Sequence, residues 1–342
     1  MSIKVGVIGF GLSARVFHLP FLKASGAFHV RAIGSSQHQA VQDSWPDVDV
    51  YSDPEALIAD GGVDLVINTA PNHAHFLLSL CALEASKHVV IEKPFVTCLV
   101  EGEVLMRQAA ESGRVLSVYH NRRWDGDFLT MKKLLREGTL GRIRYFETHF
   151  DRFRPHVRDT WRESGGEGSG ILFDLGPHLI DQAVQLFGMP NAVTAQVAAM
   201  RDGARSDDSF RITLHYEGMQ AVLVSSPFCA GPNLRYKLEG EAGTYVKYGL
   251  DPQEARLRGG LVPGGDEWAA EAKEDYGTLY TASGSEAVPT VTGGYQRYFN
   301  ALAACIEGQG PNPVPPEEAL QVMRLIELAR ESASSARTLS VM

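Results

Sequence analysis

Residues 3–14 read IKVGVIGFGLSA, in which the apolar run Ile3–Ile8 passes directly into a glycine-rich turn. The turn has the pattern G-x-G-x-x-A between a strand and a helix. Gly9 permits the tight turn, Gly11 lets the main chain approach a pyrophosphate, and Ala14 is small enough for close packing of helix on sheet. A plain strand-to-helix turn is the alternative. The stretch predicts a dinucleotide site that includes Gly9, Gly11, Leu12 and Ser13.

Short apolar runs continue to alternate with helix-like segments as far as Asn121. Strands that alternate with helices are typical of βαβ units and a parallel sheet. We therefore predict an α/β fold whose first domain, residues 1–121, contains a parallel sheet. Its expected strands are Ile3–Ile8, Phe28–Ile33, Val48–Tyr51, Leu65–Asn68, Val89–Ile91 and Val115–Tyr119.

The pattern changes in the second part of the chain, residues 122–342. A helix is expected over Asp125–Arg136 and two more close the chain, over Gly294–Ile306 and Glu317–Ser334. The glycine- and proline-rich stretch Gly249–Gly284 is expected to form surface loops. Alternating segments predict an α+β domain with a large, mainly antiparallel open sheet packed on one face. These strands are Ile143–Phe150, Phe210–Tyr216, Ala221–Ser226 and Leu234–Glu239.

Composition limits the classes of partner. The 342 residues are 44% hydrophobic and 21% charged, which are ordinary globular values for a chain long enough to form two domains. The formal charge is -9 and long Lys/Arg runs are missing, so nucleic acid and anionic membrane surfaces are disfavoured. No stretch reaches the ~18 apolar residues of a membrane span. Small molecules are the expected ligands.

The cysteines indicate a reducing compartment. Their dispersed positions, without a C-x-x-C pair, disfavour a disulfide framework and a thiolate zinc site. The N-terminal apolar run is too short for a signal-peptide core. We expect a cytoplasmic protein with no metal centre. The cysteines are Cys81, Cys98, Cys229 and Cys305.

The end of the second strand bears on the choice of dinucleotide. Ser35 and Ser36 stand where an acidic residue would hold an adenine-ribose 2′-hydroxyl and repel a 2′-phosphate. Hydroxyl donors without a carboxylate favour NADP. Two alternatives stay open: the serines cap the next helix, or NAD is used, because no arginine stands beside them.

Two further strand ends carry polar groups. Thr69, Pro71 and Asn72 follow one strand and are expected at the nicotinamide ribose, although Pro-Asn is also ordinary turn chemistry. Glu92-Lys93-Pro94-Phe95 follows another strand. Ligands of open α/β sheets lie at the carboxyl ends of strands. Lys93 is therefore a candidate for a residue that takes part in the reaction, with a structural cap as the alternative. Pro94 fixes the chain direction after it and could adopt a cis bond.

The segment Gly168–Asp181 joins flexible glycines to a helix start. If the helix begins near Phe173, Asp174 and His178 lie four residues apart on one face and can converge on one substrate hydroxyl. Two other interpretations remain: Asp174 is an N-terminal cap with His178 in the core, or Asp174, His178 and Asp181 bind a metal ion.

In combination these motifs resemble the Gfo/Idh/MocA family of glucose-fructose oxidoreductase and inositol dehydrogenase. The resemblance spans almost the whole chain, and Gly249–Glu254 is further similar to NADP-dependent scyllo-inositol dehydrogenases of that family. The motifs are Gly9-x-Gly11-x-x-Ala14, Thr69-x-Pro71-Asn72-x-x-His75, Glu92-Lys93-Pro94 and Gly170-x-x-x-Asp174-x-Gly176-x-His178-x-x-Asp181. Ala14 in place of a third glycine and Ser169 within a glycine run depart from the pattern, and neither removes a reacting group.

The resemblance implies that residues 1–121 form a doubly wound Rossmann domain and that the protein carries out NAD(P)-dependent redox chemistry on a sugar, inositol or related polyol. It also implies a homodimer or homotetramer formed through the C-terminal sheet. It implies that Lys93 is the catalytic lysine, His178 the catalytic histidine and Asp174 a substrate-binding aspartate. Asn121-Arg122-Arg123-Trp124 resembles a segment near the nicotinamide. The cofactor set implied by the resemblance is completed by His75, Glu92, Lys93, Asn121, Trp161 and Arg162.

The chemistry fits these groups. Oxidation of a secondary alcohol removes the hydroxyl proton while hydride leaves the same carbon, so an acid/base group and an orienting group must meet at that oxygen. We expect His178 as acid/base, Lys93 as proton relay and electrostatic group, and Asp174 as orienter. Two rivals remain: a non-catalytic NADP-sensing regulator on the same fold, and a reductase of aldoses, anhydro-sugars or dicarbonyls.

Overall fold

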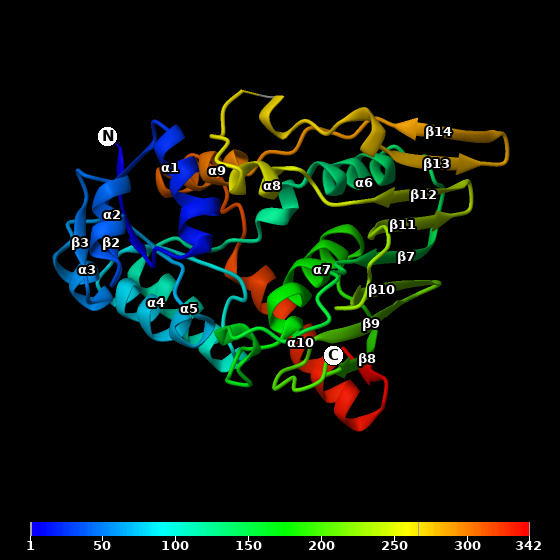
Figure 1. Cartoon of the computed structure of the whole chain (residues 1–342), viewed down its shortest axis with the longest axis horizontal. Coiled ribbons are helices and arrows are strands. Elements are labelled where there is room, and N and C mark those ends of the chain that lie inside the picture. The colour runs from blue at the N-terminus through cyan, green and yellow to red at the C-terminus, as the bar shows by residue number, and fades with distance from the viewer. Residues whose placement is uncertain (1, 266, 342) are drawn as a thin grey trace. The chain divides into compact units, whose positions relative to one another are not determined.

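The computed structural model describes residues 2–265 and 267–341. The chain divides into two compact units, each with its own sheet (Figure 1). The first unit runs to Asn121 and also takes in Gln253–Trp268 and Gly294–Leu320. The second unit contains Arg122–Pro252, Ala269–Gly293 and the chain from Gln321 onward.

The sheet of the first unit is parallel and has the strand order β3-β2-β1-β4-β5-β6. This is the doubly wound Rossmann order, so the predicted α/β class of this part is confirmed. The order reverses between β1 and β4, which is where such sheets bind ligands. The strands are β1 (Ile3–Ile8), β2 (Phe28–Gly34), β3 (Asp49–Tyr51), β4 (Leu65–Asn68), β5 (His88–Ile91) and β6 (Leu116–Val118).

The central strands of this sheet are apolar on both faces because helices cover both. Val5, Val66 and Val90 are all 0% exposed, as expected for strands in a parallel sheet. None of the helices in the described chain combines the length and apolar character that a bilayer crossing requires. The helices of this unit include α1 (Leu19–Ala24), α2 (His38–Ser44), α3 (Pro54–Asp60), α4 (His75–Glu84), α5 (Leu99–Ser112), α8 (Gln253–Arg258) and α9 (Gln296–Ile306).

The sheet of the second unit has the order β14-β13-β12-β11-β7-β10-β9-β8-β15. Its neighbours pair antiparallel except β7 and β10, which are parallel, so the predicted mainly antiparallel sheet is confirmed. The strands are β7 (Ile143–His149), β8 (Ala192–Ala198), β9 (Ser209–Tyr216), β10 (Met219–Ser225), β11 (Leu234–Gly240), β12 (Gly243–Tyr248), β13 (Gly277–Thr281), β14 (Gly284–Val288) and β15 (Leu339–Ser340).

Alternation along β9 defines the two faces of this sheet. Phe210, Ile212 and Leu214 are buried, whereas Arg211 and Thr213 between them keep contact with solvent. Helix α7 packs on β9 and β10, so the buried side chains face that helix. The remaining helices are α6 (Gly126–Arg136), α7 (Ile171–Phe187) and α10 (Pro316–Ser335).

The prediction that Gly249–Gly284 forms only surface loops is wrong. The segment contains α8 and β13, and β14 starts at its end. Leu279 is the one large apolar residue of β13 that is buried, so the strand has no alternating apolar signal. Gly277 indicated a turn, but it serves close approach instead: a Cβ there would collide with the Tyr245 ring.

Candidate active site

The predicted ligand-binding edge is formed by three neighbouring strands of the first unit. Ile8 pairs with Asn68, and Asn68 pairs with Ile91. Because the strands are parallel, the loops that follow β1, β4 and β5 leave from the same edge of the sheet. The glycine-rich turn, the loop from Thr69 and the segment from Glu92 are therefore brought together.

The glycine-rich turn has the shape of a phosphate cradle. Gly9 has φ +101°, and a Cβ there would lie 2.5 Å from Thr69 Oγ1, so no other residue fits without strain. Gly11 and Leu12 are exposed, and a Cβ at Gly11 would meet nothing within 4 Å. Ala14 is fully buried and begins a helical segment. The exposed main chain at a helix start fits a pyrophosphate.

Ser35 and Ser36 directly follow β2 at the same edge. Ser36 is exposed, and Ser35 Oγ accepts a hydrogen bond of 3.0 Å from Gln37 N. The N-cap of α2 is Gln37, and it has no side-chain capping bond. Ser35 and Ser36 are therefore not the N-cap of α2, which was the alternative interpretation. The turn Ser35-Ser36-Gln37 contains no carboxylate.

The loop after β4 is held from inside. Asn68 Nδ2 donates to His75 O at 3.1 Å, and Asn68 Oδ1 accepts from Ala70 N at 3.2 Å. Thr69 Oγ1 donates to Ile8 O at 2.8 Å. Pro71 is exposed, and Asn72 is buried at the start of a 3-10 turn. Of this loop, Pro71 is the predicted cofactor residue most open to solvent.

His75 supports the loops in this structure. Its ring is 1% exposed, with Nδ1 2.8 Å from Pro94 O and Nε2 3.0 Å from Ala70 O. Burial lowers the pKa of His75 below its usual value despite the two carbonyls. A neutral ring carries one N–H, so it donates to one carbonyl at a time. The ring joins the loop after β4 to the segment that follows Lys93.

Glu92 and Lys93 follow β5, and the Lys93–Pro94 peptide bond is cis. The Glu92 carboxylate lies inside, where it accepts hydrogen bonds from Ser13 Oγ, from His18 at 2.8 Å and from Lys93 N at 3.1 Å. Lys93 is half-buried at the sheet edge. Sequence reasoning missed His18, because a histidine seven residues after the last cradle glycine, Gly11, belongs to no motif of its own.

Helix α7 carries the predicted catalytic pair of the second unit. It begins at Ile171 after Gly170, so Asp174 lies in its first turn and is not its cap. The cap is supplied by Asp207, whose Oδ2 accepts from Leu172 N at 2.7 Å. Asp174 and His178 lie four residues apart on one face, as predicted, with His178 6% exposed.

Arginines surround Asp174. Arg152 Nη1 lies 3.7 Å and Arg162 Nε lies 3.6 Å from its carboxylate oxygens. Arg162 also lies over the ring of its neighbour Trp161, 4.5 Å from the ring centre. The pocket here has a volume of about 40 Å³, with room for roughly three water molecules. It is lined by Arg152, Arg154, Arg158, Arg162, Asp174 and Ser226, among others.

Asp181 forms an ion pair with Arg123, which disfavours the interpretation that Asp181 is a metal ligand. Arg123 donates to both carboxylate oxygens, at 2.9 Å to Oδ2 and 2.5 Å to Oδ1. Within the described residues, no three His, Cys, Asp or Glu side chains are grouped as metal ligands. Asp181 therefore anchors α7 one turn after His178.

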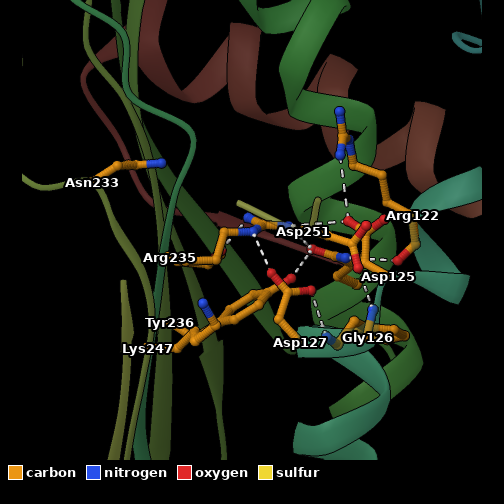
Figure 2. A network of polar contacts seen from close by, with 12 residues as sticks. Arg122, Asp125, Gly126, Asp127, Asn233, Arg235, Tyr236, Lys247 and Asp251 are labelled. Atoms are coloured by element: carbon orange, nitrogen blue, oxygen red, sulfur yellow. Dashed lines mark hydrogen bonds and ion pairs between the residues drawn. The ribbon is translucent and has the colours of Figure 1, made fainter. Parts of the chain in front are cut away.

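A buried polar network holds α7 and α6 in the second unit (Figure 2). Arg235 is fully buried, with Nε 3.4 Å from Asp127 Oδ2, and it donates from Nη2 to Gln182 Oε1 at 2.9 Å. Gln182 Nε2 donates in turn to Arg122 O at 3.0 Å. Asp251 accepts from Gly126 N at 2.7 Å and so holds the first turn of α6 (Figure 2).

The predicted site residues thus fall into two groups. Lys93 and the residues of the phosphate cradle belong to the first unit, together with Asn121, which is buried at the start of a 3-10 turn. Asp174, His178, Trp161 and Arg162 belong to the second unit.

Both halves of the chain match known family models. Residues 3–120 match the model described as oxidoreductase family, NAD-binding Rossmann fold. Residues 132–341 match the one described as oxidoreductase family, C-terminal alpha/beta domain.

Relatives match along the full length. The scyllo-inositol 2-dehydrogenase (NADP(+)) IolW of Bacillus subtilis is 43% identical, over 99% of this chain and 96% of that protein. The uncharacterized oxidoreductase YdgJ of Escherichia coli is 46% identical, over 99% of this chain and 98% of that protein. The solved structure of the putative oxidoreductase yvaA from Bacillus subtilis superposes with a TM-score of 0.96 at 41% identity, covering 100% of this chain and 99% of that one.

Proposed function

The chain belongs to the Gfo/Idh/MocA family of oxidoreductases, and from this membership we propose that it transfers hydride between NADP and a secondary alcohol of a sugar, inositol or related polyol. The observation that carries the proposal is the sheet edge of the first unit. A phosphate cradle at the end of β1 and a lysine at the end of β5 lie on one edge, two strands apart. IolW, a full-length relative whose name states an NADP-dependent inositol dehydrogenase, supports the substrate class.

NADP is the proposed cofactor, with NAD as the alternative. The turn after β2 offers the hydroxyl of Ser36 to solvent and contains no carboxylate that would repel a 2′-phosphate. Gly11, Leu12 and Ser13 would hold the pyrophosphate through main-chain N–H groups. Gly9 would contribute the tight turn, because its own N–H donates to Gly34 O at 2.8 Å. When bound, the nicotinamide supplies the hydride donor or acceptor.

The protein must manage the proton and the charge on the substrate oxygen. We assign proton exchange at the hydroxyl to His178, because imidazole is the side chain that ordinarily titrates nearest neutral pH. Lys93 stabilises negative charge as it develops on that oxygen. Asp174 orients a substrate hydroxyl by accepting its hydrogen bond, and its side chain is 20% exposed, so a hydroxyl can reach it.

A spectrophotometric screen tests the function. Purified protein is mixed with inositols, aldoses and sugar ketones, each with NADP or NAD and with the reduced forms, and the absorbance of reduced nicotinamide is followed. We expect turnover with a polyol and NADP. Turnover in the reducing direction alone would favour the aldose or dicarbonyl reductase, and binding of NADPH without turnover of any compound would favour the regulator.

Assembly and location complete the proposal. Tyr145, Glu147 and His149 of β7 lie on the face of the large sheet opposite the buried residues Phe146 and Thr148 and stay partly exposed. We place the contact between subunits of a homodimer or homotetramer on this face. Light scattering on the eluting protein would measure the mass of the assembly and so the number of subunits. The dispersed cysteines support action in the reducing cytoplasm.

A further inference from the structure

A buried acidic group lies under the proposed cofactor edge of the first unit. The Glu92 carboxylate accepts hydrogen bonds from Ser13 Oγ, from His18 Nε2 at 2.8 Å and from Lys93 N at 3.1 Å. Ser13 belongs to the phosphate cradle, and Lys93 is the proposed catalytic lysine. The Glu92 carboxylate therefore connects Ser13 of the phosphate cradle with Lys93, and both are proposed to contact the same cofactor.

Glu92 is ionised in this setting. Burial alone would raise its pKa, but the hydrogen bonds and charge of His18, the Ser13 hydroxyl and the charge of Lys93 outweigh burial and hold the pKa at about 2. A carboxylate without its proton only accepts hydrogen bonds. His18 must then carry its hydrogen on Nε2, the atom that faces Glu92.

His18 has no other polar contact among the described residues. Its side chain is 0% exposed, and its Nδ1 is buried without a hydrogen-bond partner. The ring packs instead against Tyr119 and Phe299, with centroids 4.3 Å and 5.9 Å away. An aromatic residue without nitrogen would satisfy that packing, so the one polar function of the ring is to donate to Glu92.

The backbone places this histidine by an irregular turn. Residues Ala14–His18 form a π-helix between the phosphate cradle and α1. Single π turns insert one extra residue into a helix and are frequent at functional sites. Here the wide turn starts at the last residue of the cradle and ends at His18, so the position of His18 depends on the geometry of the cradle.

We propose that His18 is a positioning residue, which acts through Glu92 to fix the Lys93 main chain relative to the phosphate cradle. The proposal rests on the proposed hydride transfer. Without the His18 donor, the carboxylate keeps two of its three donors and turns, and Lys93 moves with it. A misplacement of about 1 Å can cost roughly 100-fold in rate.

Two substitutions of His18 distinguish its hydrogen bond to Glu92 from the packing of its ring. His18→Phe keeps an aromatic ring and removes the donor, whereas His18→Gln returns an N–H close to the place of Nε2. Phe21→Leu is the matched control, because Phe21 is buried in the next turns and stacks on Phe299 at 5.4 Å without contacting Glu92. It should lower Tm and leave kcat unchanged.

The kinetic result expected is a split between kcat and KM. His18→Phe should lower kcat about 10- to 100-fold while KM for NADP changes less than about threefold, and His18→Gln should recover kcat to within about fivefold of the parent. A kcat in His18→Phe within twofold of the parent would overturn the proposal. So would a His18→Gln variant as slow as His18→Phe.

A second measurement does not depend on the reaction. Hydrogen exchange of the Lys93 amide, which donates to Glu92, should quicken about tenfold or more in His18→Phe and return toward the parent rate in His18→Gln. Unchanged exchange in His18→Phe would contradict the positioning role. If the parent protein turns over no substrate but this exchange pattern appears, the proposed function fails and the positioning role stands.

Discussion

Arg123 and Asp181 form a two-pronged ion pair inside the second unit. Arg123 donates from Nε to Oδ2 at 2.9 Å and from Nη2 to Oδ1 at 2.5 Å, and the side chains are 9% and 3% exposed. Asp181 follows His178 by three residues on α7. Arg123 belongs to the segment that resembles the family's residues near the nicotinamide. In this structure its guanidinium binds Asp181 and so stabilises α7, the helix that carries His178.

Asp181→Asn should therefore destabilise the protein strongly. The change leaves the buried Arg123 charge without its counter-charge, which costs about 3 kcal/mol. Denaturant unfolding measures this loss. The control is Arg144→Ala, which removes an exposed pair with Glu241, 45% and 53% exposed, and should cost less than about 1 kcal/mol. Equal losses in the two variants would show that burial of the Arg123 pair is irrelevant to stability.

Glu92 should make folding stability depend on acid pH. Its pKa is lowered from 4.5 to about 2, so its contribution is present above pH 4.5 and is lost as pH falls through about 2. A shift of this size corresponds to stability on the order of 3 kcal/mol. In unfolding experiments between pH 5 and about 2, Glu92→Gln should lose less stability than the parent.

Glu137→Gln is the control for that series, because Glu137 is exposed at the end of α6. It should follow the parent curve. If the free energy of unfolding falls equally with pH in Glu92→Gln and in the parent protein, the Glu92 carboxylate is not the cause of the acid dependence.

The two cradle glycines should respond differently to alanine. Gly9→Ala meets Thr69 Oγ1 at 2.5 Å and forces a side chain into φ +101°, so it should lower both Tm and NADPH affinity. Gly11→Ala meets nothing within 4 Å in the protein, so it should leave Tm unchanged. Its methyl group occupies space that the pyrophosphate needs, and affinity should drop about tenfold or more. Full NADPH affinity in Gly11→Ala would place the pyrophosphate elsewhere.

Cofactor choice should follow the turn after β2. Ser35→Asp places a carboxylate where the 2′-phosphate is expected, and should lower kcat/KM for NADP by about tenfold or more relative to NAD. Ser35→Ala removes the hydroxyl without adding charge and is the control for the loss of the turn bond to Gln37. An unchanged NADP/NAD ratio in Ser35→Asp would mean that this turn does not contact the ribose.

Much of the fold was readable from the sequence because its signals are local. Continuous apolar runs bounded by turns predict the strands of the parallel sheet, and β1, β4 and β5 end where expected. The helix that carries Asp174 and His178 was predicted within two residues of its start at Ile171. Strands β13 and β14 were not predicted, because most of their residues are exposed and because Gly277 is a residue type that usually indicates a turn.

The supporting polar groups could not be predicted for a different reason. His18 and Glu92 are 74 residues apart, and Arg235 and Gln182 are 53 apart. Contacts of this kind depend on tertiary packing and leave no periodic pattern in the chain. The sequence indicated which side chains could react, but it could not indicate which ones hold them in place.

The kinetics of Lys93→Met, together with its NADPH affinity, test the central proposal most directly. The change removes the charge proposed to act on the substrate oxygen and leaves the phosphate cradle intact. We expect kcat to fall about 100-fold or more while the NADPH dissociation constant stays within about threefold of the parent. Near-full turnover in Lys93→Met would contradict the assignment of this lysine to hydride-transfer chemistry.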